Sequence, residues 1–162
     1  FPTARLMTAY GMIQELATYI IYKKQQVRAI EDKDECLRSI YHLISRDEIA
    51  HSRFYESVVK VLLEEDREGT LADVGHVFAK FKMPAYDLVP DYEGRVSVMR
   101  SAGIDRELFF SKVYFPILKA LGTTRQEVRR VMKGREVEEK KRIHHGGTET
   151  RREEEKEEGR VN

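Results

Sequence analysis

The chain has 162 residues, of which 41% are hydrophobic and 35% are charged, and its formal net charge is +1. This length suits one hydrophobic core rather than two domains of usual size, and the near-neutral charge argues against a nucleic-acid partner. The single cysteine, Cys36, excludes an internal disulfide and favours a reducing compartment, so we expect a cytoplasmic protein. No apolar run approaches the roughly 20 residues that cross a bilayer, so no membrane span is predicted.

Two long helices are predicted in the first part of the chain. Apolar residues recur at helical spacing from Thr3 to about Ile30, without an internal proline. The same period resumes after a charged break and continues to about Glu65. Asp32 followed by Glu35 resembles a capping box, so we place the start of the second helix there. A short break between two long helices predicts an antiparallel hairpin.

Shorter helices are predicted after the hairpin. We expect Gly69 and Thr70 to end the second helix and to cap a third, whose apolar stripe ends at Pro84. Three further helices are predicted, with Pro116 kinking the middle one, over Tyr92–Ala102, Asp105–Leu121 and Thr123–Lys133. Because no strand pattern competes with these helices, the predicted fold class is all-α.

The composition changes near the C-terminus. From Gly134 to Asn162, 17 of 29 residues are Arg, Lys or Glu, and three are aliphatic. Such a segment buries too little apolar surface to form part of a core. We therefore predict a helical domain over residues 1–133 and a charged tail over residues 134–162, either disordered or a solitary helix.

The residues that point to chemistry are Glu15 and the quartet Glu48-Ile49-Ala50-His51. In an antiparallel hairpin, residues equidistant from the turn lie at the same height, and the mean of 15 and 48 falls in the charged break between the helices. The two carboxylates should therefore face each other. His51 follows Glu48 by three residues and shares its helix face, so the three side chains can reach one metal ion. Thr18 shares the face of Glu15.

A second interpretation of these residues is an ion-pair network at the surface edge. In that arrangement Glu48 pairs with Arg53 or Lys60, and His51 is a hydrogen-bonded core histidine. The metal interpretation draws its support from the matched height of Glu15, because Glu-x-x-His alone occurs often by chance. A glutamate inside an apolar stripe also loses hydration, and a cation compensates that loss.

Two motifs resemble those of the soluble acyl-carrier-protein desaturases. The segment Gln14-Glu15-Leu16-Ala17-Thr18 is similar to the family's Q-E-x-A-T segment, and Asp47-Glu48-Ile49-Ala50-His51 is similar to its D-E-x-x-H helix. The similarity extends over roughly residues 3 to 133 and has a bacterial, especially actinobacterial, character. It implies a ferritin-like helical bundle, represented here by its C-terminal half: a long antiparallel helix hairpin plus shorter helices.

The resemblance also implies a reaction and residue roles. The intact protein would be an oxidoreductase of fatty acid biosynthesis that uses O2 and two Fe ions to insert a double bond into a carrier-bound fatty acyl chain. Glu48 would bridge the two irons, and Glu15 and His51 would be terminal ligands of one of them. Thr18 would lie near the oxygen-binding side and assist proton delivery, and Asp47 would hydrogen-bond a metal-bound histidine.

The chain departs from the family pattern before Glu15. The family takes three further ligands from helices that precede this position, and fourteen residues precede it here. We therefore expect a C-terminal portion that is inactive alone, with the other helices encoded upstream. The second possibility is that two copies pair and each contributes one hairpin.

Two other functions remain open from the sequence. One is a homodimeric, hairpin-ferritin-like protein that binds and oxidises iron, and the other is a non-catalytic helical remnant. For the desaturase, the resemblance implies an acyl carrier protein as substrate carrier, a ferredoxin-type electron donor and a homodimer in the intact form.

Overall fold

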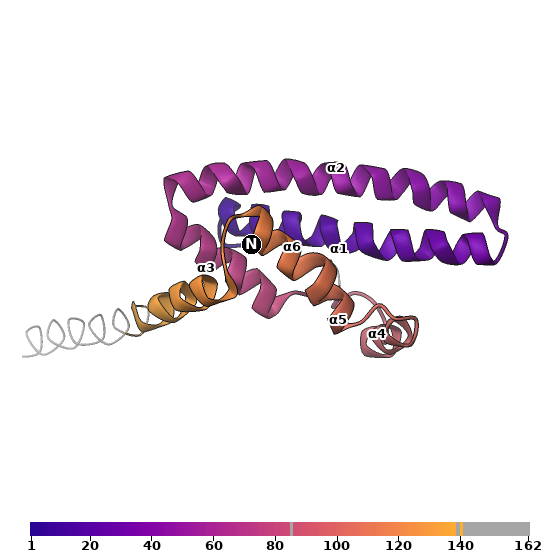
Figure 1. Ribbon diagram of the computed structural model, residues 1–162. Coiled ribbons are helices and arrows are strands. Elements are labelled where there is room, and N and C mark those ends of the chain that lie inside the picture. The colour runs from indigo at the N-terminus through magenta and orange to yellow at the C-terminus, as the bar shows by residue number, and fades with distance from the viewer. Residues whose placement is uncertain (85, 139, 141–162) are drawn as a thin grey trace, which may run out of the picture.

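The computed structural model describes residues 1–84, 86–138 and 140, and every regular element among them is helical (Figure 1). Two long helices, α1 (Ala4–Glu31) and α2 (Glu35–Glu65), run antiparallel, and α3 (Arg67–Lys80) follows directly. The predicted all-α class and long hairpin are confirmed, and this arrangement is consistent with a ferritin-like bundle. Within the described ranges no helix has the length and apolar character needed to cross a bilayer.

The turn between α1 and α2 differs from the prediction in its capping residue. Asp32 is the C-cap of α1, and Lys33 after it adopts a left-handed conformation with φ of 57°, which ends the helix. Asp34 is the N-cap of α2, and its carboxylate accepts the Leu37 N–H at 2.9 Å. The predicted capping box at Asp32 is wrong, because the Asp32 carboxylate instead accepts a hydrogen bond from Arg28 at 2.9 Å.

The start of α3 also differs from the prediction. Asp66 is its N-cap and accepts the Gly69 N–H at 2.9 Å, so Gly69 and Thr70 lie inside the first turn rather than at a helix boundary. The Thr70 hydroxyl donates to the carbonyl oxygen of Leu62 at 3.0 Å. An aspartate three residues before an amide makes a better cap than the predicted Gly-Thr pair, because its carboxylate reaches that N–H directly.

The remaining helices follow the predicted order. The predicted segment 92–102 forms α4 (Tyr92–Ser101), and the segment 105–121 is divided into α5 (Arg106–Phe109), a π-helical turn η1 (Phe110–Tyr114) and α6 (Phe115–Ala120). Pro116 has no N–H to donate to the carbonyl of Lys112, and the wider π turn lies just before it. A π turn thus interrupts the predicted helix next to Pro116, and the predicted kink stays a prediction.

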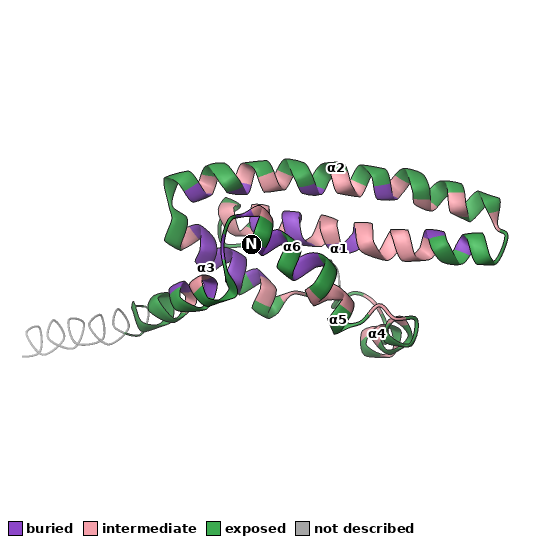
Figure 2. Cartoon of the chain, in the orientation of Figure 1, coloured by how far each residue is buried: buried purple, intermediate pink, exposed green. Residues whose placement is uncertain are grey.

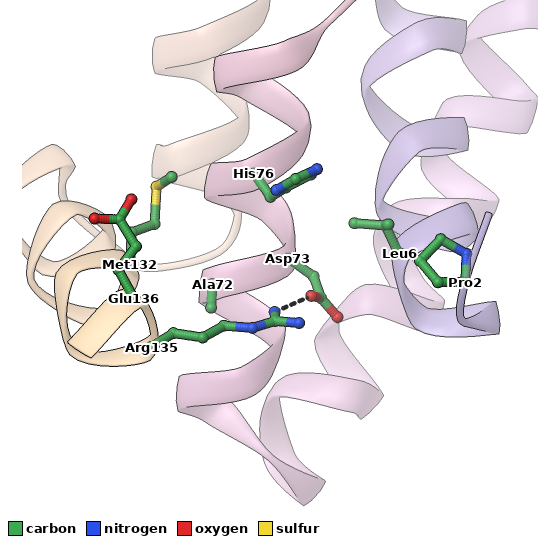
Figure 3. A pocket seen from close by; sticks show the side chains of 8 residues that line it. All are labelled: Pro2, Leu6, Ala72, Asp73, His76, Met132, Arg135 and Glu136. Carbon is green, nitrogen blue, oxygen red and sulfur yellow. Dashed lines mark hydrogen bonds and ion pairs between the residues drawn. The ribbon is translucent and has the colours of Figure 1, made fainter. Parts of the chain in front are cut away.

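A last helix covers residues 125–138 and crosses the boundary predicted at residue 133. Arg135 Nη1 donates to one oxygen of Asp73 at 2.5 Å (Figure 3), and Arg5 Nε donates to the other at 2.6 Å. The Asp73 side chain is 4% exposed, so a buried carboxylate joins α3 to the start of α1 and to the last helix. Residues 139 and 141–162 of the predicted tail lie outside the described residues, and the division at residue 133 stays a prediction.

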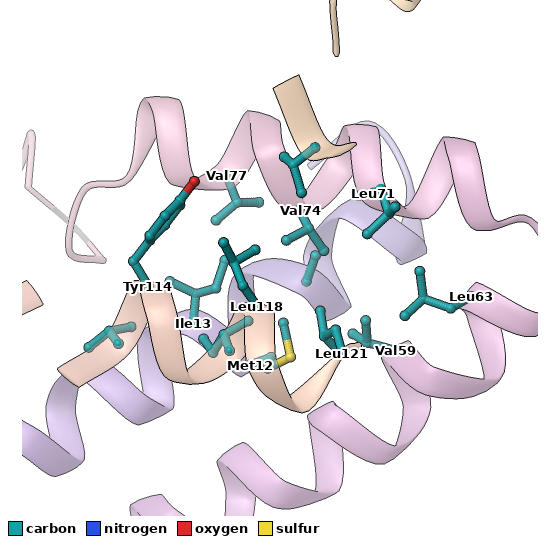
Figure 4. Close-up of a cluster of buried hydrophobic side chains, with 14 of the residues drawn as sticks. Met12, Ile13, Val59, Leu63, Leu71, Val74, Val77, Tyr114, Leu118 and Leu121 are labelled. Carbon is teal, nitrogen blue, oxygen red and sulfur yellow. The ribbon is translucent and has the colours of Figure 1, made fainter. Parts of the chain in front are cut away.

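The hydrophobic core lies on one side of the hairpin, where α3 and α6 pack against α1 (Figure 4). Its fully buried side chains include Ile13 of α1, Val59 of α2 and Val74 of α3. Gly11 permits the close approach of the two long helices, since a Cβ there would lie 3.0 Å from the Tyr55 ring. The outer side of α2 is exposed along most of its length (Figure 2). The hairpin is therefore covered on one side and open on the other.

Candidate metal centre

Glu15 of α1 and Glu48 and His51 of α2 meet across the hairpin. Each offers one ligand atom, and these atoms all lie within 4.8 Å of one another. His51 Nδ1 is 3.6 Å from Glu15 Oε2. The predicted facing of the two carboxylates is confirmed by this geometry, because a turn at residues 32–34 brings positions 15 and 48 to the same height. Their role as metal ligands stays a prediction.

Thr18 lies one helical turn after Glu15 and contacts the same group. Its hydroxyl is 3.2 Å from Glu48 Oε2, 3.1 Å from the carbonyl oxygen of Gln14 and 3.0 Å from that of Glu15. A hydroxyl carries one proton, so it donates to one of these acceptors at a time. Thr18 is buried and can therefore exchange a hydrogen bond between the backbone and the Glu48 carboxylate without bulk water.

Asp47 lies apart from this group. Its side chain is exposed, and its hydrogen bonds within the described part of the chain run to Arg46 at 3.4 Å rather than to His51. On a helix, adjacent residues point about 100° apart, so Asp47 and Glu48 cannot face the same ion. The predicted contact between Asp47 and a metal-bound histidine is not formed inside this hairpin.

The electrostatics of the site favour a cation. Burial and, after it, the hydrogen bond and charge of Glu15 together raise the pKa of Glu48 from 4.5 to about 7, against smaller opposing effects of Thr18 and His51. Burial also raises the pKa of Tyr22, and the nearby Glu48, Tyr41 and Glu15 groups add to this effect. Two carboxylates this close repel each other when both are ionised, and a metal ion between them reverses that cost.

The alternative ion-pair network is not the arrangement that the structure shows. Lys60 pairs with Glu56 at 2.5 Å, one turn away on the same helix. The His51 side chain is 60% exposed, so His51 is not a core histidine. Glu48 is instead bonded to Thr18 and Glu15, as the metal interpretation expects.

The donor set fits iron. Carboxylate oxygens mixed with an imidazole nitrogen are typical ligands of iron, and a glutamate plus Glu-x-x-His on facing helices is the set that each half of a di-iron carboxylate site supplies. These donors lie on the open side of the hairpin, where further ligands can approach. The three side chains therefore fit half of such a centre.

Two features of the molecule had no signal in the sequence. The Arg5–Asp73–Arg135 cluster joins residues 62 and 68 positions apart, and no local pattern indicates such a pairing. An apolar cavity of about 450 Å³ is lined by α1, α3, α4 and the α5–η1 region, including Ala17, Ile20 and Phe109. Ala17 and Ile20 point away from the Glu15 side of α1, so this cavity does not open onto the candidate metal centre.

One comparison with known proteins identifies the family of this chain. Residues 4–160 match the fatty acid desaturase family, a range that contains the whole hairpin and all three donor residues. A search of curated proteins gives no match. Because the family match covers nearly the entire chain, the chain belongs to the type 2 fatty acid desaturase family.

Proposed function

We propose that the chain supplies half of the di-iron centre of a desaturase that acts on fatty acyl chains carried by acyl carrier protein. The observation that carries this proposal is the convergence of the Glu15, Glu48 and His51 donors within 4.8 Å. The family match supports desaturation of a fatty acid. The carrier-bound substrate, a ferredoxin-type electron donor and a cytoplasmic location rest on the resemblance of the two motifs.

In this proposal each donor has one role. Glu15, Glu48 and His51 would hold the iron, with Glu48 shared between two ions and Glu15 and His51 as ligands of one of them. When bound, the iron would activate O2, which, with two electrons from the donor and two protons, takes two hydrogens from neighbouring methylenes and leaves as two waters. The protein supplies position and charge, because the carboxylates neutralise the metal and the hairpin fixes their spacing.

Proton movement is the second task of these residues. Since the pKa of Glu48 is raised to about 7, this carboxyl is mostly protonated below about pH 7 in the absence of a cation, and that proton leaves when a metal binds. The Thr18 hydroxyl, 3.2 Å from Glu48 Oε2, is placed to accept or return a proton at that oxygen. Asp47 can hydrogen-bond a metal-bound histidine only if that histidine comes from outside this hairpin.

The test is a reconstituted desaturation assay. Iron-loaded protein is mixed with reduced ferredoxin, its reductase, O2 and acyl carrier protein that bears saturated acyl groups of several lengths. The masses of the acyl groups are then measured by mass spectrometry. The proposal expects a product that is lighter by two hydrogens once the other helices of the bundle are supplied, from an upstream segment or a second copy, and none when the chain carries Glu48→Gln. The chain alone is expected to give no product. Iron oxidation without an acyl product would support the ferritin-like alternative, and failure to bind iron would support the remnant.

A further inference from the structure

Two tyrosines, Tyr22 of α1 and Tyr41 of α2, form a ring pair across the hairpin beside the metal donors. Their ring centroids are 6.1 Å apart, a separation at which aromatic side chains interact. Tyr22 follows Glu15 by seven residues, and Tyr41 precedes Glu48 by seven residues. Seven residues are close to two helical turns, so both rings lie on the faces that carry the carboxylates.

The two rings lean in different directions relative to the metal donors. A side chain on a helix points back toward the N-terminus of that helix. Because α1 and α2 are antiparallel, Tyr22 leans toward Glu15 and Glu48, whereas Tyr41 leans toward the turn at residues 32–34. The electrostatics agree, since burial raises the pKa of Tyr22 and the charges of Glu48, Tyr41 and Glu15 add to this effect. Tyr22 is therefore the inner ring of the pair, and Tyr41 is the outer ring.

A phenol next to an iron site has a chemistry that its apolar neighbours lack. It can lose one electron together with its proton, which gives a tyrosyl radical. Both Tyr22 and Tyr41 are half-buried, so a phenol proton can leave to water. Tyr55, one turn after His51, instead packs against Gly11 and the core.

We propose that Tyr22 and Tyr41 form an exit for oxidising equivalents when the iron meets O2 in the absence of an acyl chain. In desaturation, O2, two electrons and two protons take two hydrogens from the acyl chain and give two waters. Without that chain, two phenols each supply one electron and one proton in place of these hydrogens, and two tyrosyl radicals remain. A thiol or a ferredoxin-type donor then returns one electron to each ring, and water returns the proton. This inference rests on the proposed function.

The oxidation proceeds in a fixed order. Tyr22 is oxidised first, and Tyr41 then reduces it across the ring pair. A second oxidation of Tyr22 leaves both rings as radicals. Tyr41 lies nearer the turn, so an outside donor can reach it without entering the metal site. The exit spares His51, whose imidazole is the most easily oxidised of the three metal donors.

Oxidation of the iron-loaded full chain, without an acyl chain, tests this order. Ferrous iron is bound anaerobically, unbound metal is removed and the iron per chain is measured. Hydrogen peroxide stands in for O2, because peroxide and two phenols give two tyrosyl radicals and two waters without an electron donor. A nitroso spin trap labels the oxidised rings, and peptide mass spectrometry locates the label. We expect label at Tyr22 and Tyr41, and none in zinc-loaded protein, because zinc has no redox chemistry.

The chain contains a matched control pair of tyrosines. The ring centroids of Tyr86 and Tyr92 are 6.0 Å apart, and Tyr92 lines the apolar cavity on the side of α1 away from Glu15. A freely diffusing photo-oxidant in metal-free protein should label both pairs. Peroxide with bound iron should label Tyr22 and Tyr41 only. Equal labelling of the two pairs by bound iron and peroxide would overturn the exit.

Three phenylalanine variants test the order of the rings. Tyr22→Phe keeps the ring and its packing, and we expect loss of the Tyr41 label together with a gain of oxidised His51. Tyr41→Phe should keep the Tyr22 label, and Tyr92→Phe should change neither label. A wild-type level of Tyr41 label in Tyr22→Phe would overturn the order. Label at Tyr55 without label at Tyr22 would overturn the assignment of the inner ring.

The iron content separates this inference from the proposed function. A wild-type chain that retains no iron contradicts the proposed function and this inference with it. Retained iron with unlabelled tyrosines, or with equal oxidation of His51 in the wild type and Tyr22→Phe, contradicts the exit alone. Retained iron with label at both rings, and with the Tyr41 label lost in Tyr22→Phe, supports both.

Discussion

The two sides of the α1–α2 hairpin differ in what covers them. On the closed side, α3 and α6 bury Ile13, Val74 and Leu118 in one core. On the open side, α1 and α2 present Glu15, Glu48 and the exposed His51 between half-buried apolar residues. One pair of helices thus carries the fold on one face and the candidate chemistry on the other. Changes to the two faces should therefore have separable effects on stability and on metal binding.

The largest expected difference between the two sides is in stability. Ile13→Ala removes a fully buried side chain from the closed side and should lower the free energy of unfolding by about 3 kcal/mol. Phe54→Ala removes a larger but mostly exposed side chain from the open side and should change it by less than about 0.5 kcal/mol in the metal-free monomer. Urea unfolding measured by circular dichroism compares them. Equal losses would show that the open face is already packed.

A polar contact of the closed side should have the next largest effect. Asp73→Ala leaves the Arg5 and Arg135 guanidinium groups without their shared buried carboxylate, and we expect a loss of about 2 kcal/mol because both arginines keep partial access to water. The control is Asp47→Ala, which removes an exposed aspartate from the open side. Urea midpoints that fall equally for the two variants would contradict the buried role of Asp73.

On the open side the expected effect is a pH dependence. The pKa of Glu48 is raised from 4.5 to about 7 in the folded chain, so between these values the folded state binds a proton that the unfolded state has released. Metal-free wild-type protein should therefore lose stability as the pH rises through this window. The glutamine in Glu48→Gln is neutral at every pH, so this variant should lack the loss. The melting temperature of the variant minus that of the wild type should therefore increase with pH.

The matched control for this pH series is Glu64→Gln, which removes an exposed glutamate from the same helix. Its melting temperature should follow that of the wild type across the range, measured with a chelator present. Parallel curves for all three proteins would contradict the raised pKa of Glu48 and the proximity of Glu15 that contributes to it.

The smallest expected effect lies at the turn that joins α1 to α2. Lys33 has a φ of 57°, which strains a residue with a Cβ. Lys33→Gly should raise the free energy of unfolding by about 0.5 kcal/mol, because relief of strain exceeds the added entropy of the unfolded chain. Lys33→Ala is the control and should give no gain. A destabilised glycine variant would show that the Lys33 side chain itself contributes to the turn.

The open side was more predictable from the sequence than the closed side. Helix period, hairpin symmetry and the three-residue step from Glu48 to His51 are local regularities, and they place Glu15 against Glu48 without knowledge of the rest of the fold. The all-α class follows from the same periodicity. The capping residue was missed because Asp32 and Asp34 are equally good caps in sequence, and the left-handed Lys33 decides between them.

Features of the closed side depend on packing between distant segments. Asp73 meets Arg5 and Arg135 only after α3 docks against both α1 and the last helix. Helical period places Asp73 among apolar residues of α3 but does not identify its partners. The π turn at η1 likewise reflects how the chain accommodates Pro116 while keeping Tyr114 in the core, and the proline alone predicts no more than a local irregularity.

The central claim is that Glu15, Glu48 and His51 bind iron together. The most direct measurement is an anaerobic titration of the full chain with ferrous iron, removal of unbound metal, and determination of iron per chain for the wild type, Glu48→Gln and Glu64→Gln. We predict about one iron per chain in the wild type and in Glu64→Gln, and at least tenfold weaker retention in Glu48→Gln. Equal iron retention in all three proteins, or none in the wild type, would contradict the claim.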